Sequence, residues 1–132
     1  MKLYIDKKLD INPFQKIILG KFCIFCADAL PIEGDFEIYI VSNREPYKIS
    51  TTAAYILNQN CCYIYGKNRA LPDVMRSVAH EMTHMMQDQT GLIIGKIRDA
   101  GGFHEDQANS RAGELLKLFV NKNPGHKKVY EV

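Results

Sequence analysis

The most regular pattern of apolar and polar positions lies in residues 73–90 and has the period of an α-helix. At 100° per residue, one broad arc of this helix is apolar and the opposite arc is polar. The pattern therefore predicts a helix that buries one face and lines a cleft with the other. The apolar arc comprises Val74, Met75, Val78, Ala79, Met82, Met85 and Met86, and the polar arc comprises Asp73, Arg76, Ser77, His80, Thr83, His84 and Gln87, with Glu81 and Asp88 at its edge.

Two more helices are predicted, one near each end of the chain. The first covers about 13–29, where Asn12 is the expected N-cap and Pro13 the first helical residue. The second covers about 103–121, where apolar residues again recur at helical spacing. Together with the helix at 73–90, these segments account for the long amphipathic parts of the chain.

Strands are predicted where apolar and polar residues alternate and where β-branched and aromatic residues cluster. Only three residues separate the last two strands, so we expect these two to form a hairpin. The order of elements predicts an α+β fold, with a small twisted, mostly antiparallel sheet packed against the N-terminal helix and the helix at 73–90. The strands cover 2–5, 36–42, 53–57 and 61–66, and the loops cover 43–52 and 91–102.

Length and composition indicate one globular domain over residues 1–132. Hydrophobic residues make up 46% of the chain and charged residues 24%, a balance that suits a domain with its own core. A net charge of +2 is too small to argue for nucleic acid or a membrane surface as a partner. The N-terminal residues lack the apolar core of a signal peptide, so we expect a cytoplasmic protein with its four cysteines reduced.

The polar arc carries chemistry at His80-Glu81-Met82-Thr83-His84. Two histidines four residues apart on a helix project side by side, so that both imidazoles can reach one metal ion. Glu81 would stand beside that ion without binding it. This H-E-x-x-H arrangement is typical of zinc metallopeptidases, and it occurs here in the helix that the motif requires.

A catalytic zinc site needs a third protein ligand and leaves its fourth position open. The nearby candidates include His104, Glu105 and Asp106 at the start of the last helix. Glu105 shares the apolar, inward-facing side of that helix with small alanines, which favours it as the ligand. Asn109, one turn later, could accept a hydrogen bond from the free N–H of a ligating histidine and so orient its ring.

The sequence HEMTH, followed by Glu105-Asp106-Gln107-Ala108-Asn109, resembles the gluzincin clan of zinc peptidases. The longer run HEMTHMMQD also resembles small, minimal zincin-like peptidases of bacterial and phage genomes. The resemblance covers about 53–120. The chain departs from the usual pattern at Asn109, where an aspartate is commoner, and this change removes a negative charge behind a ligating histidine.

This resemblance implies a single-domain, zincin-like endopeptidase with one Zn²⁺ held by His80, His84 and Glu105. Glu81 would act as general base on a zinc-activated water, and the substrate would be a peptide or protein segment in extended conformation. The resemblance also implies an edge strand that pairs with the substrate, and 61–66 is the segment at the matching position. Suitable residues for substrate or oxyanion contacts are Tyr47, Tyr63, Tyr65, Arg98 and His104.

Two alternatives remain open from the sequence. Zincin-like domains of the SprT type use a third histidine, which would make His104 the ligand in place of Glu105. The chain could also be a zinc-binding adaptor or a latent peptidase with little general proteolytic activity, because one small domain has little room for substrate pockets. A separate protein partner would then supply specificity.

Overall fold

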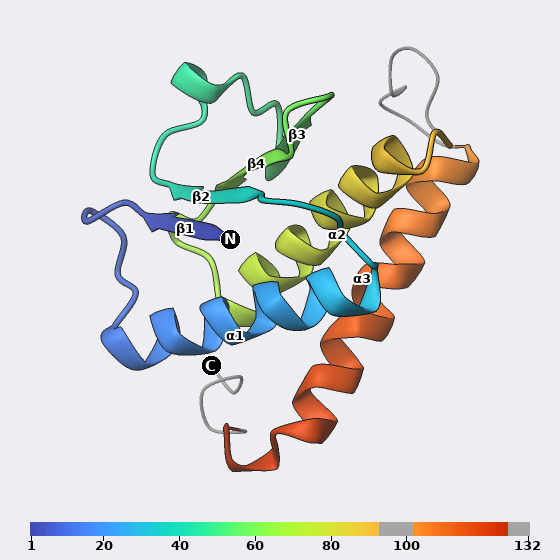
Figure 1. Ribbon diagram of the computed structural model, residues 1–132. Coiled ribbons are helices and arrows are strands. Elements are labelled where there is room, and N and C mark those ends of the chain that lie inside the picture. The colour runs from blue at the N-terminus through green and yellow to red at the C-terminus, as the bar shows by residue number, and fades with distance from the viewer. Residues whose placement is uncertain (93–101, 127–132) are drawn as a thin grey trace.

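The computed structural model describes residues 1–92 and 102–126, and within them three helices run close to their predicted limits (Figure 1). They are α1 (Pro13–Ala29), α2 (Leu71–Gln89) and α3 (Phe103–Lys122). Asn12 caps α1 as predicted, because its side chain accepts a hydrogen bond from the Gln15 amide at 2.8 Å and the Gln15 side chain accepts one from the Asn12 amide at 3.0 Å.

Four strands form one mixed sheet. They are β1 (Lys2–Ile5), β2 (Glu37–Val41), β3 (Ala53–Ile56) and β4 (Cys61–Tyr65), in the spatial order β1-β2-β4-β3. The α+β class is confirmed, but the expectation of a mostly antiparallel sheet is wrong. β1 pairs with β2 and β2 with β4 in parallel, and only β3 pairs antiparallel with β4.

The connections between the strands explain why two strand pairs are parallel and one is antiparallel. The helix α1 carries the chain from β1 back to the same end of the sheet, so that β2 starts in the same direction. Among the strands that the structure describes, β3 and β4 are the only pair joined by a connection short enough to impose antiparallel pairing. As a result β4 lies inside the sheet, and β3 forms one of its edges.

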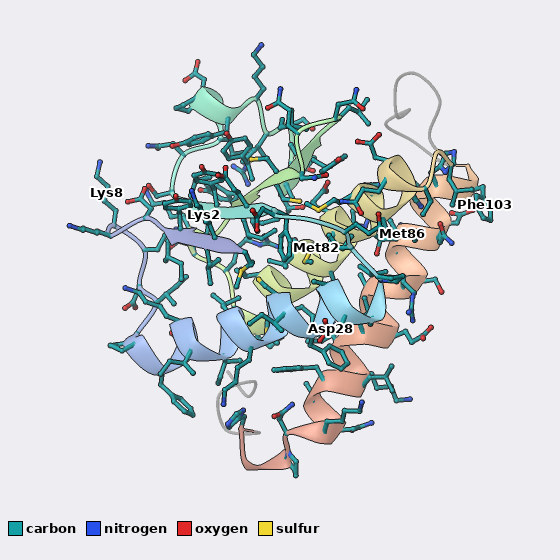
Figure 2. The ribbon with its side chains drawn as sticks, viewed as in Figure 1. Lys2, Lys8, Asp28, Met82, Met86 and Phe103 are labelled. Atoms are coloured by element: carbon teal, nitrogen blue, oxygen red, sulfur yellow. The ribbon has the colours of Figure 1, made fainter. Side chains whose placement is uncertain are left out.

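The hydrophobic core lies between one face of this sheet and the helices α1 and α2. The alternate strand residues Ile38, Ile40, Cys62 and Ile64 point into it, and the apolar arc of α2 packs against them. Met82, at the middle of that arc, lies between the sheet and α1 (Figure 2). α3 packs mainly along α2, and it therefore covers part of the polar arc that the sequence alone left exposed.

The opposite face of the sheet carries a stack of tyrosine rings. Tyr4, Tyr39 and Tyr63 are register partners on three adjacent strands, with ring centroids 4.6 Å and 5.1 Å apart. Tyr47, from the short 3-10 helix η1 (Glu45–Tyr47), continues the stack with its ring 4.8 Å from that of Tyr63. Figure 1 shows η1 on the side of the sheet away from α1 and α2.

All four cysteines are buried free thiols, as expected for reduced residues. Burial raises the pKa of Cys23 to about 12, so this thiol stays protonated and unreactive at neutral pH. Within the described ranges, the structure contains no helix with the length and apolar character needed to cross a membrane.

Candidate metal centre

The helical spacing of α2 brings His80 and His84 together. Their ring centroids lie 4.8 Å apart with the ring planes nearly perpendicular, at 83°. His84 is buried, and His80 lies at the wall of the cleft with a partly exposed ring. Two imidazoles from successive turns thus point at one location, as the H-E-x-x-H spacing predicts.

α3 adds a carboxylate to this pair. Oε1 of Glu105 lies 2.7 Å from Nε2 of His84, and Oε2 of Glu105 lies 3.4 Å from Nε2 of His80. One ligand atom from each of the three residues lies within 4.8 Å of the others, so the cluster could hold a metal ion. In the described chain the group of potential metal donors contains Glu105 and does not include the neighbouring His104.

Gln87 fixes the orientation of His84. Its amide nitrogen donates to the His104 carbonyl at 3.0 Å and to the Gln107 side-chain oxygen at 2.8 Å, so its own oxygen faces His84. That oxygen lies 2.8 Å from Nδ1 of His84 and accepts a hydrogen bond there. Gln87 therefore holds the Nδ1 side of the ring, and Nε2 is the ring nitrogen that faces Glu105 and would bind a metal.

Gln87 is a residue whose role the sequence analysis missed. The available signal was its position three residues after His84 on the polar arc, where side chains on a helix meet. The contacts with His104 and Gln107 also join α2 to α3 beside the ligands. A single fully buried amide thus serves both the ligand geometry and the packing of the two helices.

His80 is held by different neighbours. Burial lowers its pKa, with a further decrease from the nearby His84, while Glu105 and a hydrogen bond with Asn109 act in the opposite direction. The net decrease keeps the His80 ring neutral at pH 7, the form that can bind a metal. Asn109 lies at the edge of the same cleft, one turn after Glu105 on α3.

Glu81 lies directly beside the ligands. Its side chain borders the cleft although the residue is only 8% exposed, and its Oε1 is 4.0 Å from Nε2 of His80. Burial, and secondarily the charge of Glu105, raises the pKa of Glu81 to about 8. A carboxyl group with a raised pKa at the floor of a cleft is suited to exchange protons near neutral pH.

The ligands open into a cleft of about 730 Å³ between α2, β3 and the first turns of α3. The residues 50–55 form the wall opposite the polar arc of α2. Asp88, near the end of α2, fixes this wall by accepting hydrogen bonds from the Tyr55 hydroxyl at 2.6 Å and the Asn58 amide at 2.7 Å. The cleft is therefore a structured groove between a helix and a sheet edge.

Several predicted contact residues lie elsewhere. The strand 61–66 was expected at the edge of the sheet, but β4 is an inner strand and β3 forms the edge beside the cleft. Tyr63 and Tyr65 do not line the cleft, because the residues that alternate with them on β4, Cys62 and Ile64, point toward the helices. Tyr63 instead joins the tyrosine stack, and the Arg44 guanidinium lies 3.9 Å from the Tyr65 ring centroid.

The structure describes two of the other three residues that were suggested for substrate or oxyanion contacts. Tyr47 lies in the tyrosine stack, away from the cleft. His104 places its backbone carbonyl, rather than its ring, next to the site through the bond from Gln87. Arg98 lies outside the described residues.

Comparison of the chain with protein-family models, with curated proteins and with solved structures finds no match. The function of the chain must therefore be inferred from the geometry of the described residues. This geometry defines an α+β protein with a cluster of His80, His84 and Glu105 that could hold a metal ion at the floor of a cleft.

Proposed function

We propose that the chain is a zinc-dependent endopeptidase with a single zincin-like domain. The observation that carries this proposal is the arrangement of His80, His84 and Glu105 around one point, with Glu81 beside them at the floor of an open cleft. Two imidazole nitrogens and one carboxylate oxygen are a donor set that suits Zn²⁺, and three protein ligands leave a position for water or substrate.

The state of the two histidines supports zinc as the metal. Gln87 holds the Nδ1 side of His84, so Nε2 is turned toward Glu105 and the cleft. His80 is neutral because burial and His84 lower its pKa. Both rings direct Nε2 at Glu105, and the Glu105 carboxylate supplies the negative charge.

Zinc, when bound, supplies Lewis acidity that polarises a peptide carbonyl and lowers the pKa of a water molecule. Glu81 would accept a proton from the water that attacks the carbonyl carbon. The same carboxyl group would then deliver this proton to the leaving nitrogen as the peptide bond breaks. Burial of Glu81 excludes competing bulk water from this transfer.

The edge strand β3 supports an extended peptide as the substrate. β3 pairs with β4 on one side only, and its residues line the wall of the cleft opposite His80. A peptide in extended conformation could add to this edge through backbone hydrogen bonds while its carbonyl groups pass over the ligands. The bond with Asp88 holds Tyr55, and with it β3, at a fixed distance from α2.

Metal content and peptide cleavage test the proposal together. We expect purified protein to contain one zinc, the Glu105→Ala variant to lose it and the His104→Ala variant to retain it. The wild-type protein should cleave members of a peptide library, and the activity should be abolished by a chelator and restored by zinc.

The base is tested by Glu81→Gln, with Glu33→Gln as the matched control at an exposed site outside the cleft. We expect the first variant to retain zinc and lose cleavage by at least a hundredfold, since general base catalysis contributes about 10²–10⁴-fold. Wild-type cleavage by a zinc-loaded Glu81→Gln variant would contradict the mechanism. Zinc binding without cleavage of any peptide by the wild type would support the adaptor function instead.

A further inference from the structure

The part of the cleft nearest the start of α2 is basic. Lys48, Arg69 and Arg76 line the cleft, and of its three described lining carboxylates Glu81 and Glu105 belong to the candidate metal centre, which leaves Asp73 beside the basic residues. Arg76 already pairs with Asp73 at 3.1 Å, on an exposed surface. In the described chain, neither Lys48 nor Arg69 forms an ion pair with a carboxylate. This part of the cleft therefore carries an uncompensated positive charge.

Arg69 is fixed in position by neutral hydrogen-bond acceptors. Its guanidinium donates to the Tyr65 carbonyl at 2.7 Å, to the Asp73 carbonyl at 3.0 Å and to the Ser77 hydroxyl oxygen at 2.8 Å. An arginine has five N–H donors, so about two remain for a ligand. The Ser77 hydroxyl oxygen accepts from Arg69 and lines the same cleft.

These groups lie close to the proposed metal centre. Ser77, which fixes the end of the Arg69 side chain, precedes His80 by three residues, or about 4.5 Å along the helix axis. Arg76 precedes His80 by four residues, about 6 Å along the same axis. An extended peptide advances about 3.3 Å per residue, so these distances correspond to one or two residues from the bond over the metal.

We propose that the cleft selects peptides with an acidic side chain one or two residues from the cleaved bond, and that Lys48, Arg69 and Arg76 bind this side chain. The position of the acidic side chain relative to the cleaved peptide bond depends on the proposed function. The affinity of the cleft for a carboxylate depends on the basic residues alone. Arg69 supplies a preorganised guanidinium, for which a carboxylate is the matching planar partner. Lys48 and Arg76, both exposed, add charge that steers the peptide into the cleft.

Binding to a variant that cannot turn over its ligand tests this preference. The probes are fluorescein-labelled eight-residue peptides of alanine and valine with one glutamate at successive positions, and a matching set with glutamine. Zinc-loaded Glu81→Gln protein is titrated with each peptide by fluorescence anisotropy. We expect glutamate at one or two adjacent positions to tighten binding about tenfold at low salt, and by about twofold or less in 0.5 M NaCl.

Paired variants assign the preference to the basic residues. In the Glu81→Gln background, Lys48→Gln with Arg76→Gln should reduce the preference for glutamate from about tenfold to about threefold, the part that Arg69 still supplies. The matched control, Lys16→Gln with Lys117→Gln, makes the same change in net charge on exposed residues of α1 and α3 outside the cleft. We expect it to retain the full preference. Lys48→Glu with Arg76→Glu should favour peptides with lysine at the same positions.

The outcomes separate this proposal from the proposed function. Equal affinity for glutamate and glutamine peptides, or the same loss in the control pair, would overturn the acidic preference and leave the peptidase proposal unaffected. A glutamate preference that is undiminished in Lys48→Gln/Arg76→Gln would also overturn it. Selective binding of glutamate peptides by a wild-type protein that cleaves none of them would support the preference and contradict the peptidase.

Discussion

Buried Glu81 makes the stability of the metal-free protein depend on pH in an unusual direction. A carboxyl group in an ion pair stabilises the folded state as pH rises, but burial raises the pKa of Glu81 from 4.5 to about 8. Between these two values the folded chain binds a proton that the unfolded chain has released. The free energy of unfolding therefore falls as pH increases across this window.

The size of the effect follows from the two pKa values. At pH 7 the proton that folded Glu81 must take up lowers the free energy of unfolding by about 3 kcal/mol relative to low pH, because pH 7 lies about 2.5 units above 4.5 and each unit corresponds to about 1.4 kcal/mol. The same relation gives about 1.5 kcal/mol at pH 5.5 and about 4 kcal/mol at pH 7.5. Glu81→Gln removes the titration while it keeps the shape of the side chain.

We expect the stability of Glu81→Gln relative to wild type to increase by about 2.5 kcal/mol from pH 5.5 to pH 7.5. The measurement is urea unfolding of both proteins with a chelator present, followed by far-UV circular dichroism. The comparison uses only how the difference in the free energy of unfolding between the two proteins changes with pH. A part of this difference that is the same at every pH therefore does not matter. Glu33→Gln, at an exposed position, is the control.

Parallel stability curves for wild type and Glu81→Gln would refute the reasoning, because they would mean that Glu81 ionises equally easily in both states. If the stability of Glu81→Gln relative to wild type decreased as pH rises, the effect would have the opposite sign. That result would indicate a stabilising cation beside the Glu81 carboxylate. In either case the buried, proton-binding environment described for Glu81 would be wrong.

Three further changes test other contacts. Gln87→Ala leaves the His84 ring without its hydrogen-bond partner, so zinc affinity measured by competition with a chromophoric chelator should fall about 10- to 100-fold. Gly66→Ala would place a Cβ only 2.8 Å from a side-chain carbon of β2, and overpacking of this kind should destabilise the fold by about 1–3 kcal/mol in urea unfolding. Tyr55→Phe removes the bond to Asp88 and should cost about 1–3 kcal/mol in the same assay, whereas Tyr65→Phe should leave stability within about 0.5 kcal/mol.

The local pattern of the sequence was sufficient to locate the elements and to favour the potential ligands. The helical period predicted α2, and the spacing of His80 and His84 predicted their approach. Glu105 was favoured because it shares the inward face of its helix, and α3 does bring it next to both histidines. These inferences succeeded because each depends on positions within a single helix.

Features that depend on the relation between elements were not predictable in this way. Alternation showed that Cys62 and Tyr63 point to opposite faces, but only the packing of the helices decides which face is covered. The direction of β3 relative to β2, and through the hairpin that of β4, depends on the connection 42–52, which has no periodic pattern. The same connection contributes Lys48 to the cleft, a placement that helix and strand periods do not describe.

The tyrosine stack on the outer face of the sheet has an optical consequence. The chain contains seven tyrosines and no tryptophan, and four of the tyrosines belong to the stack. Coupled ring transitions should dominate its near-ultraviolet circular dichroism, so that this signal follows the pairing of β1, β2 and β4. The cleft is almost silent in this spectral region, since Tyr55 is the only aromatic ring other than histidine among its described lining residues. A tryptophan introduced at Leu57, on the cleft wall, would therefore report ligand entry by its fluorescence while the dichroism of the stack stays constant.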